Sequence, residues 1–140
     1  MTPRLPLGTF LGARSGDKGG NANVGVWVID PVEVSSVALA HDRDADLRPT
    51  SARVRLADAR YAWLESFLTI ERVRELLPEA DRLAVDVYRL PNLRAINIVI
   101  HEILGRGVAE TARTDPQAKG LGEHLRARLV EIPDDLLDPP

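Results

Sequence analysis

The chain has 140 residues, of which 44% are hydrophobic and 28% are charged, with a formal net charge of −3 and no cysteine. This composition is typical of one globular domain, and it excludes disulfides, thiolate metal sites and a wholly disordered chain. There is no basic block to support a nucleic-acid partner and no run near the ~20 apolar residues of a membrane span. The N-terminus has no signal-peptide core, so we expect a cytoplasmic protein.

Runs of apolar and β-branched residues predict the strands in chain order. Alternation over residues 5–13 predicts a first strand, and the run at 24–29 predicts a buried second one. Residues 83–88 predict a third strand, and residues 108–113 and 129–132 predict two more.

Apolar residues at helical spacing predict the helices between these strands. Residues 59–68 are amphipathic, and Thr69 can cap a second helix that Pro78 ends. Asp115, followed by a proline, predicts the start of a last helix. Residues 93–104 give the clearest helical pattern, with a core stripe of Leu93, Ile96, Ile100, Ile103 and Leu104.

Residues 32–57 interrupt this order. A β-like start, a charged tip near His41 and alternation over residues 52–56 predict a protruding β-hairpin arm, and a flexible insertion fits them equally well. A lone hairpin is marginal in water, so an ordered arm needs a surface to pack on. The simplest such surface is a second copy, which predicts a homo-oligomer, with a monomer as the alternative.

The alternation of strands and helices predicts an α+β fold with a single sheet and helices packed on one face. We expect one domain over residues 1–132. The acidic residues 133–140 are expected to form a flexible, frayed tail.

Residues 14–23 hold three glycines, two asparagines and three charged residues, which predicts a glycine-rich loop. In one interpretation, Arg14, Lys18 and backbone N–H groups bind an anion or a carboxyl group, and Asp17 orients one cation. In the other, the polar side chains bond the loop's own backbone and the loop is structural. The ligand-binding candidates here are Arg14, Ser15, Gly16, Asp17, Lys18, Gly19, Asn21 and Asn23.

A second polar group lies on the helix predicted at 93–104, where Arg94, Asn97 and His101 form one stripe. We expect this stripe to lie beside the glycine-rich loop, with Arg94 and Asn97 binding ligand. Asn97 falls close to the core face, where an unpaired amide costs about 1–3 kcal/mol, so we expect it to be buried and hydrogen-bonded.

His101 could act as an acid or a base, although a histidine beside an apolar face more often only packs there. Lys18 and Asp17 are the other catalytic candidates. The three histidines of the chain show no metal-ligand spacing, so we expect no metal and no cofactor.

Several stretches in combination resemble one family: residues 13–19, 22–26, 63–64, 68–73, 90–97 and 115–121. They resemble the C-terminal domain of AtuA-like proteins, named for acyclic terpene utilisation, over most of the chain outside residues 32–57 and the tail. The resemblance implies a ferredoxin-like fold in a domain that normally follows a much larger one. Gly20 departs from the family, because many relatives carry an acid there.

The resemblance implies an accessory or assembly domain that serves the breakdown of branched, terpenoid acyl-CoA compounds and contributes an anion-binding loop. Its partner would be a separately encoded AtuA-like large domain or a second copy. The alternative is a small stand-alone enzyme or binding protein for acyl-CoA-type or carboxylate ligands. In that case Arg14, Lys18, Arg94 and His101 would surround the anionic group. The residues predict no complete catalytic set, so whether the chain is an enzyme stays open.

Overall fold

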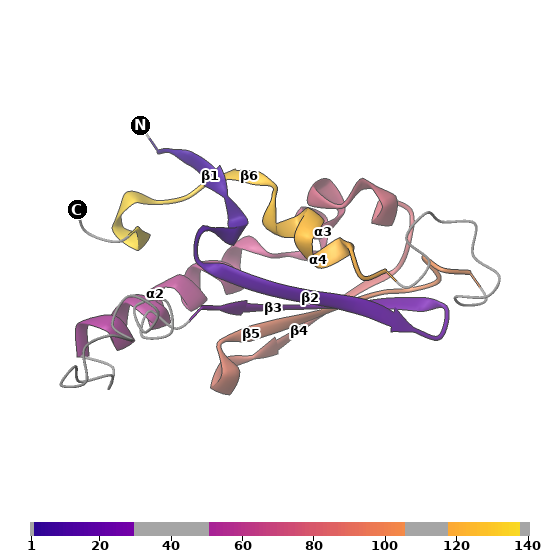
Figure 1. Ribbon diagram of the computed structural model, residues 1–140, viewed down its shortest axis with the longest axis horizontal. Helices are drawn as coiled ribbons and strands as arrows, with labels where there is room; N and C mark the ends of the chain where they lie inside the picture. The colour runs from indigo at the N-terminus through magenta and orange to yellow at the C-terminus, as the bar shows by residue number, and fades with distance from the viewer. Residues whose placement is uncertain (1, 30–50, 106–117, 138–140) are drawn as a thin grey trace, which may run out of the picture.

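The computed structural model describes residues 2–29, 51–105 and 118–137 (Figure 1). Four short 3-10 turns lie at Leu7–Thr9, Pro78–Ala80, Pro91–Leu93 and Asp134–Leu136. The helices and strands are β1 (Arg4–Pro6), β2 (Leu11–Lys18), β3 (Asn21–Val28), α2 (Ser51–Phe67), α3 (Ile70–Leu76), β4 (Val85–Leu90), β5 (Ala95–Ile100), α4 (Leu121–Arg126) and β6 (Leu129–Glu131).

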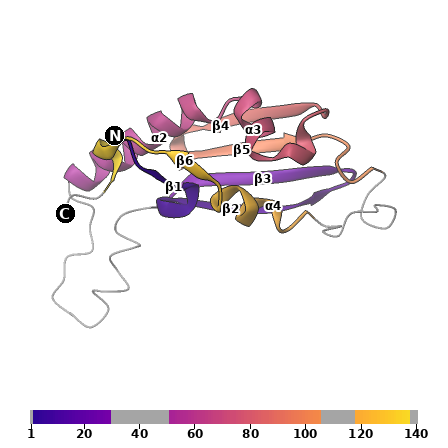
Figure 2. The ribbon, with the colours of Figure 1, turned by 90° about the horizontal axis from the view of Figure 1, so that it is seen from above.

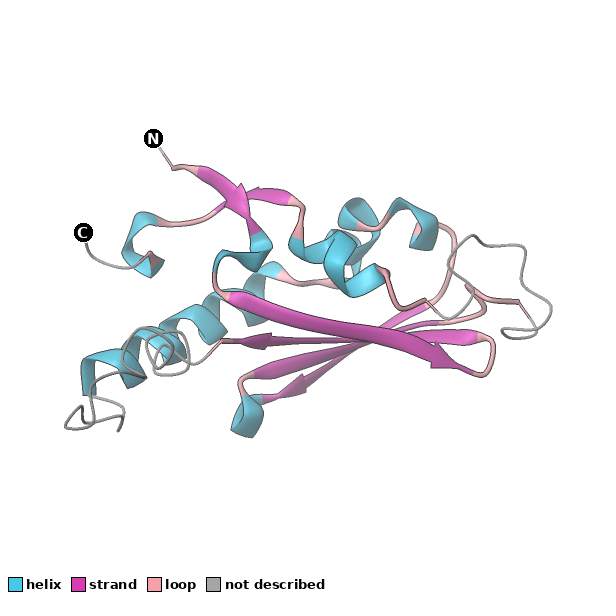
Figure 3. Cartoon of the chain, viewed as in Figure 1, coloured by secondary structure: helices cyan, strands magenta, loops and turns pink. Residues whose placement is uncertain are grey.

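The main sheet is antiparallel, with its four strands in the order β2-β3-β5-β4 (Figure 2). The central strands β3 and β5 have an alternating pattern, in which every second residue is buried. β1 and β6 form a separate two-stranded sheet (Figure 3). Alternation at period two puts one set of side chains on each side of the main sheet, so the two faces have different compositions.

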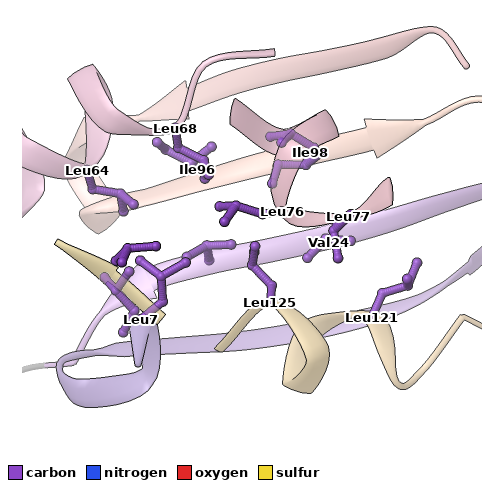
Figure 4. Close-up of a cluster of buried hydrophobic side chains, with 14 of the residues drawn as sticks. Leu7, Val24, Leu64, Leu68, Leu76, Leu77, Ile96, Ile98, Leu121 and Leu125 are labelled. Carbon is purple, nitrogen blue, oxygen red and sulfur yellow. The ribbon is translucent and has the colours of Figure 1, made fainter. Parts of the chain in front are cut away.

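One face of the sheet and the helices enclose the core. The side chains from the sheet include Val24, Ile96 and Ile98, and leucines from all three described helical regions pack against them (Figure 4). Those leucines are Leu64, Leu68, Leu76, Leu77, Leu121 and Leu125. The predicted α+β fold, with helices on one face of a single main sheet, is confirmed.

The boundaries of α3 follow the sequence prediction. Thr69 is its N-cap, and the Thr69 hydroxyl accepts a hydrogen bond from the Arg72 N–H at 3.1 Å. Pro78 begins the turn that follows the helix. A polar cap and a proline act locally, which is why both ends could be predicted.

The helix predicted at residues 93–104 is wrong. Pro91–Leu93 is a 3-10 turn, Arg94 adopts a left-handed conformation with φ of 46°, and residues 95–100 form β5. The helical pattern gave no role to Ile98, whereas the buried set at 96, 98 and 100 has period two. Ladders to β3 and β4 on both sides give β5 its backbone hydrogen bonds, so tertiary pairing decides the structure here.

The predicted glycine-rich loop is also wrong, because residues 14–18 belong to β2 and residues 21–23 to β3. Only Gly19 and Gly20 form the turn between them, and Gly19 has a φ of +63°, which suits glycine. The first predicted strand is divided by the turn at Leu7–Thr9 into β1 and β2.

The predicted arm and tail differ as well. Residues 51–57 begin α2 instead of forming a strand, and residues 32–50 lie outside the described residues, as does the strand predicted at 108–113. Within the predicted tail, residues 134–136 form a turn that packs on α2, because Leu136 is buried and its carbonyl accepts a hydrogen bond from Arg60 Nε at 2.8 Å.

Tyr61 should make stability sensitive to alkaline pH. It is buried on α2, and its hydroxyl donates to the Ala95 carbonyl at 3.0 Å. Burial, helped by the Glu65 carboxylate, raises the pKa of Tyr61. As the pH rises, the hydroxyl of Tyr61 therefore loses its proton in the unfolded chain before it does so in the folded one. The contribution of Tyr61 to the free energy of unfolding is complete below its unfolded pKa of about 10 and is lost as the pH rises above that value.

We expect Tyr61→Phe to lower the free energy of unfolding by about 1 kcal/mol at neutral pH, because the bond to Ala95 is lost. Urea unfolding at neutral and alkaline pH measures the effect. Above a pH of about 10, the unfolding free energy of the variant should fall less steeply than that of the wild type. An identical alkaline decline in both proteins would contradict this account.

Candidate functional site

The face of the main sheet that points away from the helices is called the open face here. It consists of the alternate residues of the four strands: Gly12, Arg14, Gly16, Lys18, Asn21, Asn23, Gly25, Trp27, Ala95, Asn97, Val99, Asp86, Tyr88 and Leu90. In the described part of the chain, the helices pack on the opposite face (Figure 1). The open face therefore displays polar and apolar side chains that the core does not use.

Two predicted site residues lie in one row across this face. Arg14 pairs with Gly25, and Gly25 pairs with Asn97. Because neighbouring strands lie about 4.8 Å apart, Arg14 and Asn97 are separated by about 10 Å of backbone with no side chain between them. A Cβ added at Gly25 would meet nothing closer than the Arg14 carbonyl at 3.9 Å. The row thus has a bare centre that a bound group could approach closely.

A shallow depression lies over Gly16. Arg14 and Lys18 flank this glycine along β2, both are exposed, and both belong to the open face. Asn23 lines the depression from the neighbouring strand, and a Cβ added at Gly16 would meet nothing within 4 Å. Within the part of the chain that the structure describes, neither cation forms an ion pair.

The amide oxygen of Asn23 adds a second feature to this depression. Asn23 Oδ1 is buried and has no hydrogen-bond partner among the described residues. A buried acceptor without a partner costs about 1–3 kcal/mol, and rotation of the amide toward a bound N–H or O–H donor would offset that cost. Arg14 and Lys18, which have no ion pair among the described residues, together with the Asn23 oxygen suit an anionic ligand that also carries a donor.

The open face also carries a histidine–carboxylate pair. His101, just after β5, lies with its Nε2 2.7 Å from Asp86 Oδ2 on β4. The Tyr88 hydroxyl donates to the same oxygen at 3.4 Å. The side chains of His101 and Asp86 are 37% and 49% exposed, so a ligand could reach both. Asp86 was not predicted, although its place as a lone acid in an apolar strand was a usable signal.

Asn97 is half-buried on the open face, and its side chain makes no hydrogen bond within the described residues. The prediction that it is buried and hydrogen-bonded is wrong, because that prediction assumed a helix. Arg14, Asn97 and His101 nevertheless share one face, as expected of a common site.

Arg94 and Asp17 lie away from the open face. Arg94 pairs with Asp58 of α2 on the helix side, with Nε and Oδ1 2.8 Å apart. Asp17 alternates with Lys18 along β2, so its side chain points to the opposite side of the sheet. Arg94 therefore lies outside the depression, and Asp17 lines its edge but forms no ion pair with Arg14 or Lys18 among the described residues.

Ser15 and Asn21 fasten parts of the fold together. Ser15 lies on the helix face, where its hydroxyl accepts a hydrogen bond from the Gly122 N–H at 2.8 Å. Asn21 Oδ1 accepts one from the Glu102 N–H at 2.9 Å, and so joins the β2–β3 turn to the segment after β5. With Gly19 in the turn, three ligand-binding candidates have structural roles that sequence alone did not distinguish.

The described residues also bear on metal binding and on membrane insertion. No cluster of three or more histidine, aspartate or glutamate side chains there could hold a metal ion. No helix in the same residues is both long and apolar enough to cross a membrane.

Comparisons with known proteins bear on the whole fold. The model of the AtuA ferredoxin-like domain matches residues 5–131. No curated protein and no solved structure matches the chain. The matched range contains every described helix and strand except the first residue of β1, and it includes the open face. On the strength of this match over nearly its whole length, the chain belongs to the AtuA ferredoxin-like domain family.

Proposed function

We propose that this chain is an accessory domain of an AtuA-like system, which docks its open face onto a larger AtuA-like chain. The observation that carries this proposal is the one-sided packing of the sheet, which leaves the open face without a covering helix among the described residues. A surface of this kind can supply residues to a site formed between two chains.

The end of the open face near the Pro91–Leu93 turn is apolar. Tyr88, Leu90 and Leu93 are 51%, 41% and 70% exposed, and Trp27 lies on the same end of the face. One exposed leucine is ordinary, but a group of large apolar side chains, including aromatic ones, is typical of the core of an interface. This end would provide most of the contact area for the partner.

Charge favours a different chain over a second copy as the partner. Among the described residues of the open face, Asp86 is the one acid and already pairs with His101, so the same face of a second copy would bring no unpaired acid to Arg14 and Lys18. Burying unpaired cations is costly, whereas a partner with acidic groups, or a bound anion, would offset their charge. The homo-oligomer expected from residues 32–57 is the alternative, and the co-expression experiment described below distinguishes it from a complex with a larger chain.

We further propose that the depression over Gly16 holds the anionic group of a ligand shared with the partner. Arg14 and Lys18 would supply the charge, and Asn23 would accept a hydrogen bond from the ligand. The resemblance to AtuA-like proteins favours a branched, terpenoid acyl-CoA compound as that ligand.

The test is to co-express the full chain with a larger AtuA-like chain from the same genome and to purify the complex. Leu90→Lys should weaken the complex at least about tenfold, because it places a charge in the apolar end of the interface. Leu129→Lys is the matched control, since Leu129 is 55% exposed but lies on β6. Equal binding by both variants, or a chain that pairs only with itself, would refute the proposal.

A second candidate function is that of a stand-alone binding protein or enzyme. The exposed pair of His101 and Asp86 favours it, because this pair is complete within one chain. Acyl-CoA binding by the isolated chain, lost in Lys18→Glu, would support this function.

A further inference from the structure

We propose that His101 and Asp86 form a proton-accepting site on the open face, for an acyl thioester that carries its own carboxylate. His101 is the base, and Asp86 is a positioning residue. The proposal rests on the proposed function only in taking an acyl thioester as the ligand.

The pair of His101 and Asp86 contributes little to the stability of the fold. It joins β4 to β5, which are already held together by a ladder running from Val85 to Leu90. Both side chains are exposed, and an exposed ion pair contributes at most about 1 kcal/mol to stability. By contrast, buried bonds such as that from Arg60 to Leu136 connect segments far apart in the chain.

The geometry suits a base. An ionised carboxylate only accepts hydrogen bonds, so Nε2 of His101 carries the proton that Asp86 accepts. In its neutral form the ring presents Nδ1 as a bare acceptor, and Nδ1 has no hydrogen bond within the described residues. A carboxylate that orients an imidazole in this way also stabilises the imidazolium formed by proton transfer.

The spacing of the two sites selects the ligand. His101 follows β5 and Lys18 ends β2, so two strand spacings, or about 10 Å of backbone, separate the base from Lys18, and Arg14 lies four residues further along β2. The pantetheine arm that separates the phosphates of coenzyme A from its thioester is longer than this. A carboxylate on the acyl group itself fits the distance from His101 to Lys18, and it is the anion that we assign to the depression.

The proposed proton transfer needs no reactant besides the ligand and His101. His101 Nδ1 takes a proton from the carbon next to the thioester carbonyl, so a C–H bond breaks and an N–H bond forms. The electron pair moves onto the carbonyl oxygen as an enolate, and Asp86 offsets the charge of the imidazolium. Return of a proton from the ring restores the ligand.

Deuterium exchange measures this step with no further reactant. The full chain is incubated in heavy water with β-methylglutaryl-CoA or with isovaleryl-CoA, two thioesters that differ in the terminal carboxylate. Deuterium should enter the position next to the carbonyl of β-methylglutaryl-CoA, and at least about ten times more slowly in isovaleryl-CoA. His101→Gln should lower the rate by about 100-fold or more, and Asp86→Asn by about tenfold.

His124→Gln is the matched control, because His124 also lies near a carboxylate, that of Glu79 at 3.7 Å, but on the helix side. Its rate should equal that of the wild type. NMR of the isotope-labelled ring nitrogens should show the His101 proton on Nε2 with the downfield shift of a hydrogen-bonded N–H, and this shift should be lost in Asp86→Ala.

Three outcomes would overturn the inference: no exchange above buffer, equal exchange in both thioesters, or exchange unchanged in a folded His101→Gln variant. If the chain docks onto the larger AtuA-like chain but catalyses no deuterium exchange, only this inference fails and the proposed accessory function stands. Exchange by a chain that docks onto no partner would refute the proposed function alone.

Discussion

Ile98→Ala is expected to lower the free energy of unfolding by about 3–4 kcal/mol, the largest single effect that the structure predicts. Ile98 has 0% exposure in the central strand β5, where it pairs with Val24 and Val87 and packs in the core beneath the helices (Figure 4). Truncation removes buried methyl groups and leaves a cavity that close-packed neighbours cannot fill. Urea unfolding followed by circular dichroism measures the loss.

Leu93→Ala is the control. Comparing it with Ile98→Ala also tests whether residues 95–100 form a strand or part of a helix. Leu93 is 70% exposed in the turn before β5, so its truncation should change stability by less than about 0.5 kcal/mol. If residues 93–104 formed a helix, Leu93 would belong to the core stripe and Ile98 would not. The opposite ranking of the two variants would therefore disprove β5.

Arg60→Ala is expected to lower the free energy of unfolding by about 2–3 kcal/mol. Arg60 is 5% exposed on α2, and its guanidinium lies over the Phe10 ring at 4.7 Å while Nε donates to the Leu136 carbonyl. Its removal leaves that carbonyl unpaired in a buried place and frees the segment after β6. Differential scanning calorimetry measures the loss of stability.

Limited proteolysis adds a second measurement, because cleavage after residue 132 should accelerate in Arg60→Ala if the contact with Leu136 holds the tail. Arg55→Ala, an exposed position on the same helix, should change neither stability nor cleavage. A tail that is cut equally fast in wild type and Arg60→Ala would show that Arg60 does not anchor it.

The candidate site shows where sequence reasoning succeeds. Arg14, Lys18 and Asn97 were chosen for their chemistry, and the structure places all three on one face. Their chemical character depends only on residue type. Asp86 was missed because its partner His101 is 15 residues away, so only the pairing of β4 with β5 brings them together.

The sequence by itself determined the α+β class, the buried strand at 24–29 and the boundaries of α3, because hydrophobic period, a polar cap and a proline act over a few residues. Only the tertiary structure decided that residues 14–23 form a hairpin and that residues 95–100 form a strand. Their apolar and glycine patterns suited more than one local structure. Pairing of β2 with β3 across the Gly19–Gly20 turn, and of β5 with both its neighbour β4 and the distant β3, selected the strands and thereby created the open face.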